Sequence, residues 1–381
     1  MHHSKPTIMT DSRKTKNIFI IVTNRCNLRC VYCYEQGKNT ASTNLATMKQ
    51  VLEKEMQDMD FDSFDIVFHG GEPFLEWSLM CELSEWLWKN YSHRHLRLMA
   101  TTNGTLLNGE MKSWLTENRE RFALILSLDG GRETHNRNRC NSFDRIDFDF
   151  FLRNWPRQRV KMTVNPDALP NMYNDILAIR DIGFLVNPSL AMEVPWNTEI
   201  AAPVFADQLE LLIGYYLDHP DLEPCSMVDL SPALLVNTAN IPRNRACGAG
   251  FNIVAYDMYG HRYPCHSFIS DFSREYDKEK IEQLFCDLNC KNGLELSPGC
   301  KDCFIYPHCE PCYGMNFSHR GDMGRFDPAV CVFTKIRVKA AASMYTRMLV
   351  SDKDYCLLRK LSDETKRNII LGIDNIQKHL I

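Results

Sequence analysis

Three cysteines lie close together near the start of the chain, within the stretch VTNRCNLRCVYCYE (residues 22–35). Their spacing, C-x3-C-x2-C, puts Cys26, Cys30 and Cys33 in one loop. Three kinds of chemistry fit such thiols: a zinc site, a disulfide with one thiol left over, or an iron–sulfur cluster with three protein ligands. A structural zinc site needs a fourth ligand, whereas a cluster held by three cysteines leaves one iron open to a ligand from outside the protein. The loop itself contains no further cysteine or histidine.

The sixteen cysteines are distributed unevenly, with three between positions 26 and 33 and nine between 247 and 331. No apolar signal segment begins the chain, and no apolar run approaches the roughly 18 residues of a membrane span. We therefore expect a cytoplasmic protein, in which clustered cysteines more often bind metal than form disulfides. The net charge of −4 and the dispersed basic residues predict neither a nucleic-acid partner nor a membrane partner.

Residues 17 to about 190 alternate strand-like apolar runs with amphipathic helical stretches. Six βα units in series predict an α/β fold: a parallel sheet with helices outside, curved into a partial (β/α)6 TIM-like barrel. Active sites of such barrels form at the C-terminal ends of the strands. The predicted strands are 17–23, 64–70, 96–103, 122–130, 159–165 and 184–192, and the predicted helices include 44–59 and 76–91. The cysteine loop, HGGEP (69–73), TTNGT (101–105) and SLDGG (127–131) follow the first four strands in turn.

The alternation of strands and helices stops at about residue 241, where Cys, Gly and Pro become dominant. Such a region has too little regular apolar pattern for a core of its own, so we expect metal to staple it. Helical patterns are predicted on either side of it, at 202–220 and 329–349. The expected organisation is a flexible N-terminal segment (1–16), the barrel (17–200), a connecting helical segment (201–240), a small cysteine-rich α+β domain (241–340) and C-terminal helices (341–381).

The cysteine loop, with the aromatic Tyr32 before its last cysteine, closely resembles the signature of the radical SAM superfamily. The resemblance implies a [4Fe–4S] cluster on Cys26, Cys30 and Cys33, whose open iron binds the amino and carboxylate groups of S-adenosylmethionine. One-electron cleavage of the C–S bond of this cofactor then gives a 5′-deoxyadenosyl radical. A zinc or redox knot is the competing interpretation of the loop taken alone.

The same resemblance implies cofactor contacts at the other strand ends. The GGE motif would bind the amino group, and its glycines would let the backbone approach a ligand closely, although a Gly-Gly pair alone more often marks a turn. Ser127 would contact the methionyl carboxylate or ribose, and Arg139, with Arg137 as its rival, would pair with the carboxylate. Asn165 would reach the adenine or cap the following turn. The implied set is Tyr32, Gly70, Gly71, Glu72, Pro73, Thr102, Asn103, Ser127, Arg139 and Asn165.

The second cysteine region is similar to the SPASM domain of radical SAM enzymes, which binds two auxiliary iron–sulfur clusters. Seven cysteines follow the family order, and Gly260 lies five residues before Cys265. The resemblance implies three [4Fe–4S] clusters in all, two of them auxiliary. The outer auxiliary cluster would be held by Cys300, Cys303, Cys309 and Cys331, and the inner one by Cys247, Cys265 and Cys312. A zinc ribbon is the alternative for CKDC…CEPC taken alone.

Two departures from the family pattern affect the inner cluster. Only two residues, rather than the usual three, separate Cys309 from Cys312, and the tighter loop could shift Cys312. Ile253 stands where some members have an eighth cysteine. The inner cluster would then have an open iron for a substrate thiolate, or Cys286 or Cys290 would complete its ligands.

The resemblance implies an enzyme, a radical SAM oxidoreductase that modifies a protein or a ribosomally made peptide. The expected product is a thioether or a carbon–carbon crosslink. Formylglycine formation in sulfatases ranks second, because those maturases have an aspartate base directly after the cysteine of G-x4-C, where this chain has His266. Asp129 and Glu193 are further candidate proton acceptors near strand ends. A non-catalytic, metal-stapled binding protein is the alternative from another class.

Partners of such an enzyme follow from the same resemblance. Many peptide-modifying relatives have an N-terminal winged-helix domain that grips a leader peptide, and the 16 residues before the first strand are too few for one. We expect recognition by the barrel, by residues 190–245, or by a separate leader-peptide recognition protein. The expected electron donor is a reductant such as flavodoxin or ferredoxin.

Overall fold

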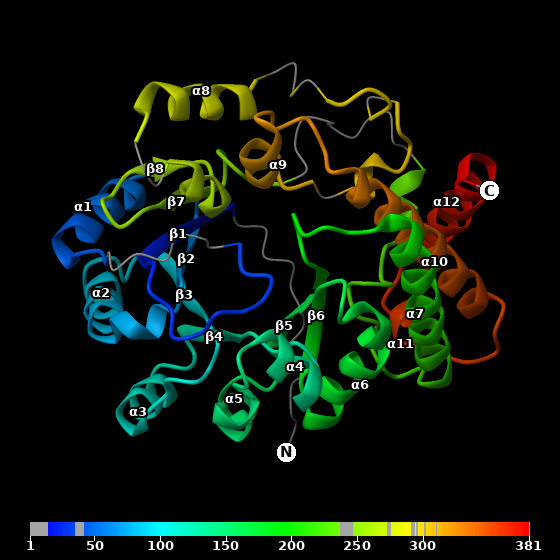
Figure 1. Cartoon of the computed structure of the whole chain (residues 1–381), viewed down its shortest axis with the longest axis horizontal. Helices are drawn as coiled ribbons and strands as arrows, with labels where there is room; N and C mark the ends of the chain where they lie inside the picture. The colour runs from blue at the N-terminus through cyan, green and yellow to red at the C-terminus, as the bar shows by residue number, and fades with distance from the viewer. Residues whose placement is uncertain are drawn as a thin grey trace.

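Six parallel strands form the inner wall of a partial barrel, and helices lie outside it (Figure 1). The strands are β1 (Thr15–Thr23), β2 (Ser63–Gly70), β3 (His95–Thr102), β4 (Phe122–Leu126), β5 (Arg159–Val164) and β6 (Leu185–Leu190). The computed structural model describes residues 14–34, 42–236, 247–272, 276–290, 294, 296–300, 302–309 and 311–380. The predicted α/β barrel, followed by a cysteine-rich region, is confirmed. Residues 1–13 of the expected N-terminal segment lie outside the described residues, as do residues 237–246.

The sheet is continuous through its first four strands, in the order β4-β3-β2-β1, and β5 pairs with β6 beside them. The two parts meet at a single bridge between Ser127 and Lys161, next to which the Leu128 amide donates to the Lys161 carbonyl at 2.9 Å. β4 ends at Leu126, four residues before the predicted end, so SLDGG is loop rather than strand. This loop therefore faces the C-terminal ends of the strands.

The outer helices follow the strands in chain order. They are α1 (Leu45–Met56), α2 (Trp77–Asn90), α3 (Gly109–Glu117), α4 (Arg132–Asn138), α5 (Phe148–Asn154) and α6 (Met172–Ile182). In α1 the Asn44 side chain caps the first turn by accepting from the Thr47 amide at 2.9 Å. Met48, Leu52 and Met56, four residues apart, form its buried stripe in the main core.

The cysteine-rich region extends the barrel sheet and has a core of its own. β7 (Ile253–Tyr256) runs parallel to β1, and β8 (Arg262–Tyr263) pairs antiparallel with β7. Helices α8 (Lys278–Leu288) and α9 (Tyr313–Arg320) cover this edge (Figure 1). The expectation that the region lacks a core was wrong, because a cluster of buried residues, including Tyr263, Phe268 and Leu284, packs together with Ile21 of β1.

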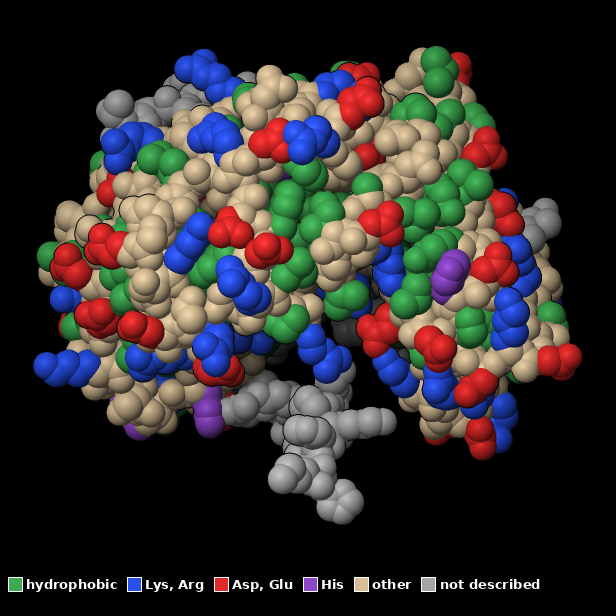
Figure 2. All heavy atoms as spheres, turned by 90° about the horizontal axis from the view of Figure 1, so that it is seen from below, with side chains coloured by type: hydrophobic (Ala, Val, Ile, Leu, Met, Phe, Trp, Pro, Cys, Tyr) green, Lys and Arg blue, Asp and Glu red, His purple; other side chains and the backbone are tan. Residues whose placement is uncertain are grey.

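A helical layer on the other side of the molecule packs α7 (Thr198–Asp218) against α10 (Pro328–Leu349), with Phe333 in edge contact with Phe205. The last helices, α11 (Cys356–Arg359) and α12 (Asp363–Leu380), lie beside them (Figure 1). The face drawn in Figure 2 carries acidic and basic side chains interspersed. Within the described residues, no helix has both the length and the apolar character needed to cross a membrane.

Candidate active site

A cavity of about 210 Å³ opens where the strand ends meet the cysteine loop. It brings together segments that lie far apart in the sequence, as the predicted barrel requires. The predicted residues on its wall are Cys26, Cys30, Tyr32, Cys33, Gly70, Gly71, Glu72, Thr102, Asn103, Ser127 and Arg139. The structure thus gathers all three loop cysteines and eight of the ten implied cofactor contacts.

The two glycines of the GGE motif pack against the cysteine loop. A Cβ on Gly70 would lie 2.1 Å from the Thr23 carbonyl oxygen, and one on Gly71 would lie 2.2 Å from the Arg25 carbonyl oxygen. The Gly71 and Glu72 amides donate to these same two oxygens, at 2.9 and 2.8 Å. The packing that requires glycine at these positions is against the cysteine loop, and the predicted contact of both glycines with a ligand stays a prediction.

Glu72 is a buried carboxylate on the cavity wall, with 1% of its surface exposed. Its oxygens accept hydrogen bonds from the Thr102 hydroxyl at 2.9 Å and the Asn103 amide at 2.8 Å. Burial raises the pKa of Glu72 to about 7 even though these hydrogen bonds favour the ionised form. A cationic group placed next to Glu72 would stabilise its charge.

Asp129 holds Tyr32 and Arg139 against the cysteine loop. Its carboxylate accepts from the Tyr32 hydroxyl, lies 2.9 Å from Arg139 Nε, and accepts from the Thr163 amide at 3.1 Å. Asp129 is fully buried and does not line the cavity. Its three partners and its place outside the cavity wall fit a positioning role better than the predicted role as a proton acceptor.

Arg139 also reaches the cysteines, with Nη1 3.9 Å from Cys30 Sγ. The pKa of the Cys30 thiol is raised to about 11, mainly by burial, with Arg139 opposing the shift and the neighbouring Cys33 adding to it. Cluster binding must therefore displace a proton from this thiol. The nearby guanidinium would stabilise the thiolate that results.

Three basic side chains near the cavity form a group that was not predicted from the sequence. His69 and Lys161 line the cavity, and the ring of His266 lies behind His69 with centroids 4.8 Å apart. Burial lowers the pKa of His69 well below its usual range and that of His266 to about 4, while Lys161 lowers both further. Both imidazoles are therefore neutral at pH 7. The position of Lys161 could have been predicted from the sequence. It lies between Val160 and Met162 in β5, and alternate residues of a barrel strand point to opposite faces of the sheet.

Three other predicted residues lie away from this cavity. Pro73 is buried at the start of a short 3₁₀ turn, Pro73–Glu76. The Asn165 side chain accepts from the Ala168 amide at 3.0 Å, which is the turn-capping alternative. Glu193 makes a two-point ion pair with Arg320, at 2.9 Å for each contact, and lines a second cavity.

Electrostatic influence links several cysteines of the second region, whose division between two clusters stays a prediction. Burial raises the pKa of Cys265, and Cys312 and Cys247 raise it further. Burial likewise raises the pKa of Cys309 to about 12, with further contributions from Cys300, Cys331 and Cys303. Because thiols influence one another only at short range, Cys247 and Cys312 lie near Cys265, and Cys300, Cys303 and Cys331 lie near Cys309.

The cysteines are present as thiols, which a metal or cluster would bind after they lose a proton. All sixteen cysteines are free thiols. Among the described residues, no three His, Cys, Asp or Glu side chains are arranged to hold one metal ion. Ligands of a cubane bind different irons and so lie farther apart than ligands of a single zinc. Cys286 and Cys290 are exposed, and Cys290 lines a separate cavity of about 350 Å³, so their predicted ligand role stays a prediction.

Comparison with protein families agrees with this geometry. Residues 20–156 match the model of the Radical SAM superfamily. The match includes the cysteine loop and strands β2 to β4 of the barrel.

Curated relatives include a sulfatase-maturating enzyme and a bacteriocin biosynthesis protein. The chain is 29% identical over 123 residues to the cysteine-type anaerobic sulfatase-maturating enzyme of Clostridium perfringens, which covers 30% of this chain and 32% of that protein. It is 25% identical over 271 residues to the antilisterial bacteriocin subtilosin biosynthesis protein AlbA of Bacillus subtilis, covering 66% and 55%. The chain thus spans about a third to about half of the length of these relatives.

Solved structures share the fold over most of the chain. The structure of anSMEcpe with bound AdoMet has a TM-score of 0.70 at 16% identity, covering 94% of this chain and 98% of that one. Streptococcus suis SuiB bound to the precursor peptide SuiA has a TM-score of 0.60 at 16% identity, covering 84% and 76%. Both likenesses extend beyond the barrel into the cysteine-rich region.

Proposed function

We propose that this chain is a radical SAM enzyme that oxidatively modifies a peptide or protein. When bound at a reduced cluster, S-adenosylmethionine supplies a 5′-deoxyadenosyl radical able to take an unactivated hydrogen atom from a substrate. The observation that carries the proposal is the single cavity at which the three loop thiols meet Glu72, Arg139 and the strand ends. A non-catalytic scaffold protein would not need three thiols, a carboxylate and a guanidinium around one cavity.

The charged residues near the cavity complement the charges of the amino and carboxylate groups of S-adenosylmethionine. Glu72 would receive the cationic amino group, and Arg139, held by Asp129, would lie on the side of its carboxylate. Ser127 and Thr102 add hydroxyl groups at neighbouring strand ends. Together these side chains would fix the cofactor's orientation before any chemistry occurs.

The auxiliary cysteine groups support an oxidative outcome. A substrate radical that forms a new bond must lose an electron and a proton. Clusters on the group Cys247, Cys265 and Cys312, and on the group around Cys309, would accept the electron. We propose His69, on the cavity wall, as the first acceptor of this proton, although burial lowers the pKa of its imidazole and makes it a weak base. We propose thioether or carbon–carbon crosslinking of a ribosomally made peptide as this outcome.

The recognition of a peptide by SuiB and the names of the sulfatase-maturating and bacteriocin relatives support this substrate class. Formylglycine formation is the second candidate, because the chain has His266, rather than the aspartate base of the sulfatase maturases, directly after Cys265. A leader-peptide recognition protein and a flavodoxin or ferredoxin reductant complete the proposal.

Anaerobic reconstitution tests the proposal. Three cubanes predict a brown protein with roughly twelve irons and twelve sulfides per chain. With dithionite and S-adenosylmethionine, this protein should release 5′-deoxyadenosine, and Cys30→Ser should abolish the release. Cys81→Ser is the matched control, because Cys81 lies on α2. A colourless, zinc-loaded protein that never cleaves the cofactor would instead support the metal-stapled binding protein.

The two candidate reactions differ in product mass. A crosslink lowers the mass of a candidate peptide by two hydrogens without releasing an aldehyde. Formylglycine formation on a cysteine-containing sulfatase peptide releases sulfide and leaves an aldehyde that hydrazide reagents capture. Mass spectrometry of both peptides after turnover therefore separates the two.

A further inference from the structure

A second cavity, of about 520 Å³, adjoins the first. The two share the wall segment Ser189–Met192, which continues from the end of β6. The far side of the second cavity is formed by α10 and by α9, whose N-cap residue is Cys312. An occupant of the second cavity would thus lie between the proposed reaction cavity and a proposed ligand of the inner cluster.

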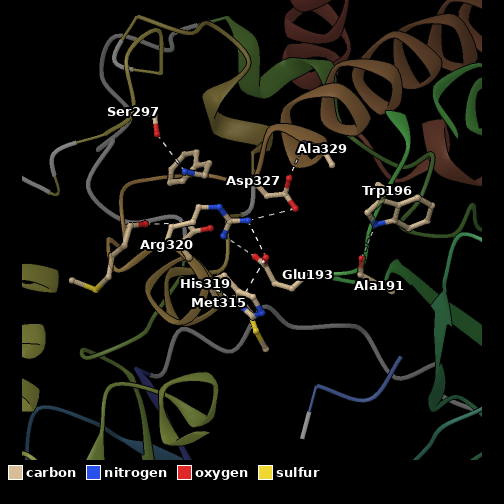
Figure 3. Close-up of polar contacts among 12 residues, drawn as sticks. Ala191, Glu193, Trp196, Ser297, Met315, His319, Arg320, Asp327 and Ala329 are labelled. Carbon is tan, nitrogen blue, oxygen red and sulfur yellow. Dashed lines mark hydrogen bonds and ion pairs between the residues drawn. The ribbon is translucent and has the colours of Figure 1, made fainter. Parts of the chain in front are cut away.

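The charged groups on the wall of this second cavity are engaged with one another. Figure 3 shows the Arg320 guanidinium between the carboxylates of Glu193 and Asp327. Asp229 accepts from the Tyr345 hydroxyl at 2.9 Å, and Arg337 donates to the Ser226 carbonyl at 2.8 Å. An ionic ligand would have to compete with these internal pairs, at a desolvation cost.

The wall also has uncharged polar side chains, among them Asn187, Asn316 and Thr334, and a set of adaptable apolar ones. Met192, Met227, Met315, Leu230, Val330 and Phe333 contribute side chains. Trp196 presents its ring to Phe333 and uses its only donor on the Ala191 carbonyl, at 2.9 Å. Met192 remains 46% exposed at the boundary of the two cavities. Methionine is unbranched and polarisable, so three of them let a pocket fit apolar groups of different shape.

The Glu193–Arg320 pair fixes this boundary. Glu193 has a φ of +55°, a left-handed conformation that is unfavourable for a residue other than glycine. Its two-point contact with Arg320, the last residue of α9, holds that conformation. The pair therefore ties the segment with Met192 to the same helix that begins at Cys312.

From these observations we propose that the second cavity binds an apolar, preferably aromatic, side chain of the substrate peptide next to the residue that reacts. The inference rests on the proposed function, since it names the neighbour of the reacting residue. The volume of the second cavity lies within the range of about 300–1,000 Å³ that is typical of ligand pockets. Because the two cavities share the wall segment Ser189–Met192, a bound peptide would place neighbouring side chains in the two cavities.

The test uses small probes rather than the unidentified peptide. N-acetyl-phenylalaninamide and N-acetyl-glutamate amide are titrated into the cluster-loaded protein, and binding is followed by saturation-transfer NMR. We expect the phenylalanine probe to bind at least tenfold more tightly than the glutamate probe. Val330→Trp, which fills the cavity, should weaken the phenylalanine probe at least tenfold. Lys335→Trp, on the exposed side of the same helix, should leave its affinity unchanged.

A photoreactive probe, N-acetyl-4-benzoylphenylalaninamide, tests the location on the unmodified chain. Benzophenones insert preferentially into methionine C–H bonds, so peptide mapping should find the label on Met192, Met227 or Met315. Labelling elsewhere, equal binding of both probes, or undiminished binding to Val330→Trp would overturn the proposal. Release of 5′-deoxyadenosine in the absence of peptide is measured in parallel. If the probe binds but no 5′-deoxyadenosine is released, the proposed enzymatic function is wrong. If 5′-deoxyadenosine is released but the probe does not bind, the proposed role of the second cavity is wrong.

Discussion

Arg139 Nε lies 2.9 Å from Asp129 Oδ2, and the two side chains are 9% and 0% exposed. Removal of one partner of a buried ion pair leaves the other charge without compensation. We expect Asp129→Ala to lower the free energy of unfolding by about 3–5 kcal/mol. Urea denaturation of the anaerobic, cluster-loaded protein measures the loss.

Asp144→Ala is the matched control for this change. Asp144 pairs with Arg132, but these side chains are 58% and 63% exposed. Exposed pairs contribute at most about 1 kcal/mol. Equal losses in the two variants would contradict the positioning role that we assign to Asp129.

Glu72 should make stability depend on pH. Its pKa rises from 4.5 to about 7 on folding, because burial disfavours the charged form. A raised carboxyl pKa contributes stability that is complete below pH 4.5 and is lost as the pH rises through 7. The difference in unfolding free energy between wild type and Glu72→Gln should therefore fall by about 3 kcal/mol over this interval.

The control is Glu53→Gln, an exposed change on α1. Urea titrations at half-unit pH steps give both difference curves. A Glu72 curve as flat as the Glu53 curve would show that Glu72 ionises normally in the folded protein.

The same group should couple cofactor binding to proton release. If the amino group of S-adenosylmethionine binds at Glu72, it favours the ionised carboxylate, so affinity should fall up to about tenfold per pH unit below 7. Calorimetry at pH 6 in buffers with different ionisation enthalpies counts the released proton. Binding heats that do not depend on the buffer would rule out Glu72 as the acceptor of this cation.

Gly71→Ala should disturb the cysteine loop. The new Cβ would meet the Arg25 carbonyl oxygen at 2.2 Å, a distance that forces the backbone apart. We expect a loss of about 1–3 kcal/mol in unfolding free energy and incomplete loading of the N-terminal cluster, measured as iron content and electron paramagnetic resonance intensity.

Gly109→Ala provides the comparison, because nothing lies within 4 Å of a Cβ at this position in α3. Alanine is the better helix former, so this variant should be as stable as wild type or more stable by up to about 1 kcal/mol. Full cluster loading of Gly71→Ala would refute the packing argument.

Arg320→Lys should loosen the segment around Glu193. Lysine cannot reproduce the two-point contact of the guanidinium, and hydrogen bonds to charged groups contribute about 1.5–3 kcal/mol. Hydrogen exchange in residues 190–196 should accelerate about tenfold or more. Arg347→Lys, at the exposed pair with Glu210, should leave this exchange unchanged; acceleration in both variants would point to general destabilisation instead.

The barrel was predictable because its signals are local. Each strand is an apolar run of a few residues, and β2 was predicted one residue short, at 64–70 instead of Ser63–Gly70. The cysteine loop and GGEP were also readable, because their residue types and spacing are confined to short stretches. Their meeting at one cavity followed from strand order in a parallel barrel.

What the sequence did not reveal depends on contacts between distant segments. Asp129 reads as a candidate base, but its partners Tyr32, Arg139 and the Thr163 amide come from three other parts of the chain. The core of the cysteine-rich region was missed because its apolar residues are scattered among Gly, Pro and Cys and are completed by Ile21 of β1. Periodicity within a window cannot report such pairings.

The parallel pairing of β1 with β7 has a consequence for synthesis of the chain. Asn17 lies opposite Ile253, so one edge of β1 stays unpaired until the ribosome has added another 236 residues. At about 5–20 residues per second, that delay is roughly 10–50 s. During this time the open edge of β1 can pair with strands of other polypeptides, which exposes the unfinished barrel to aggregation.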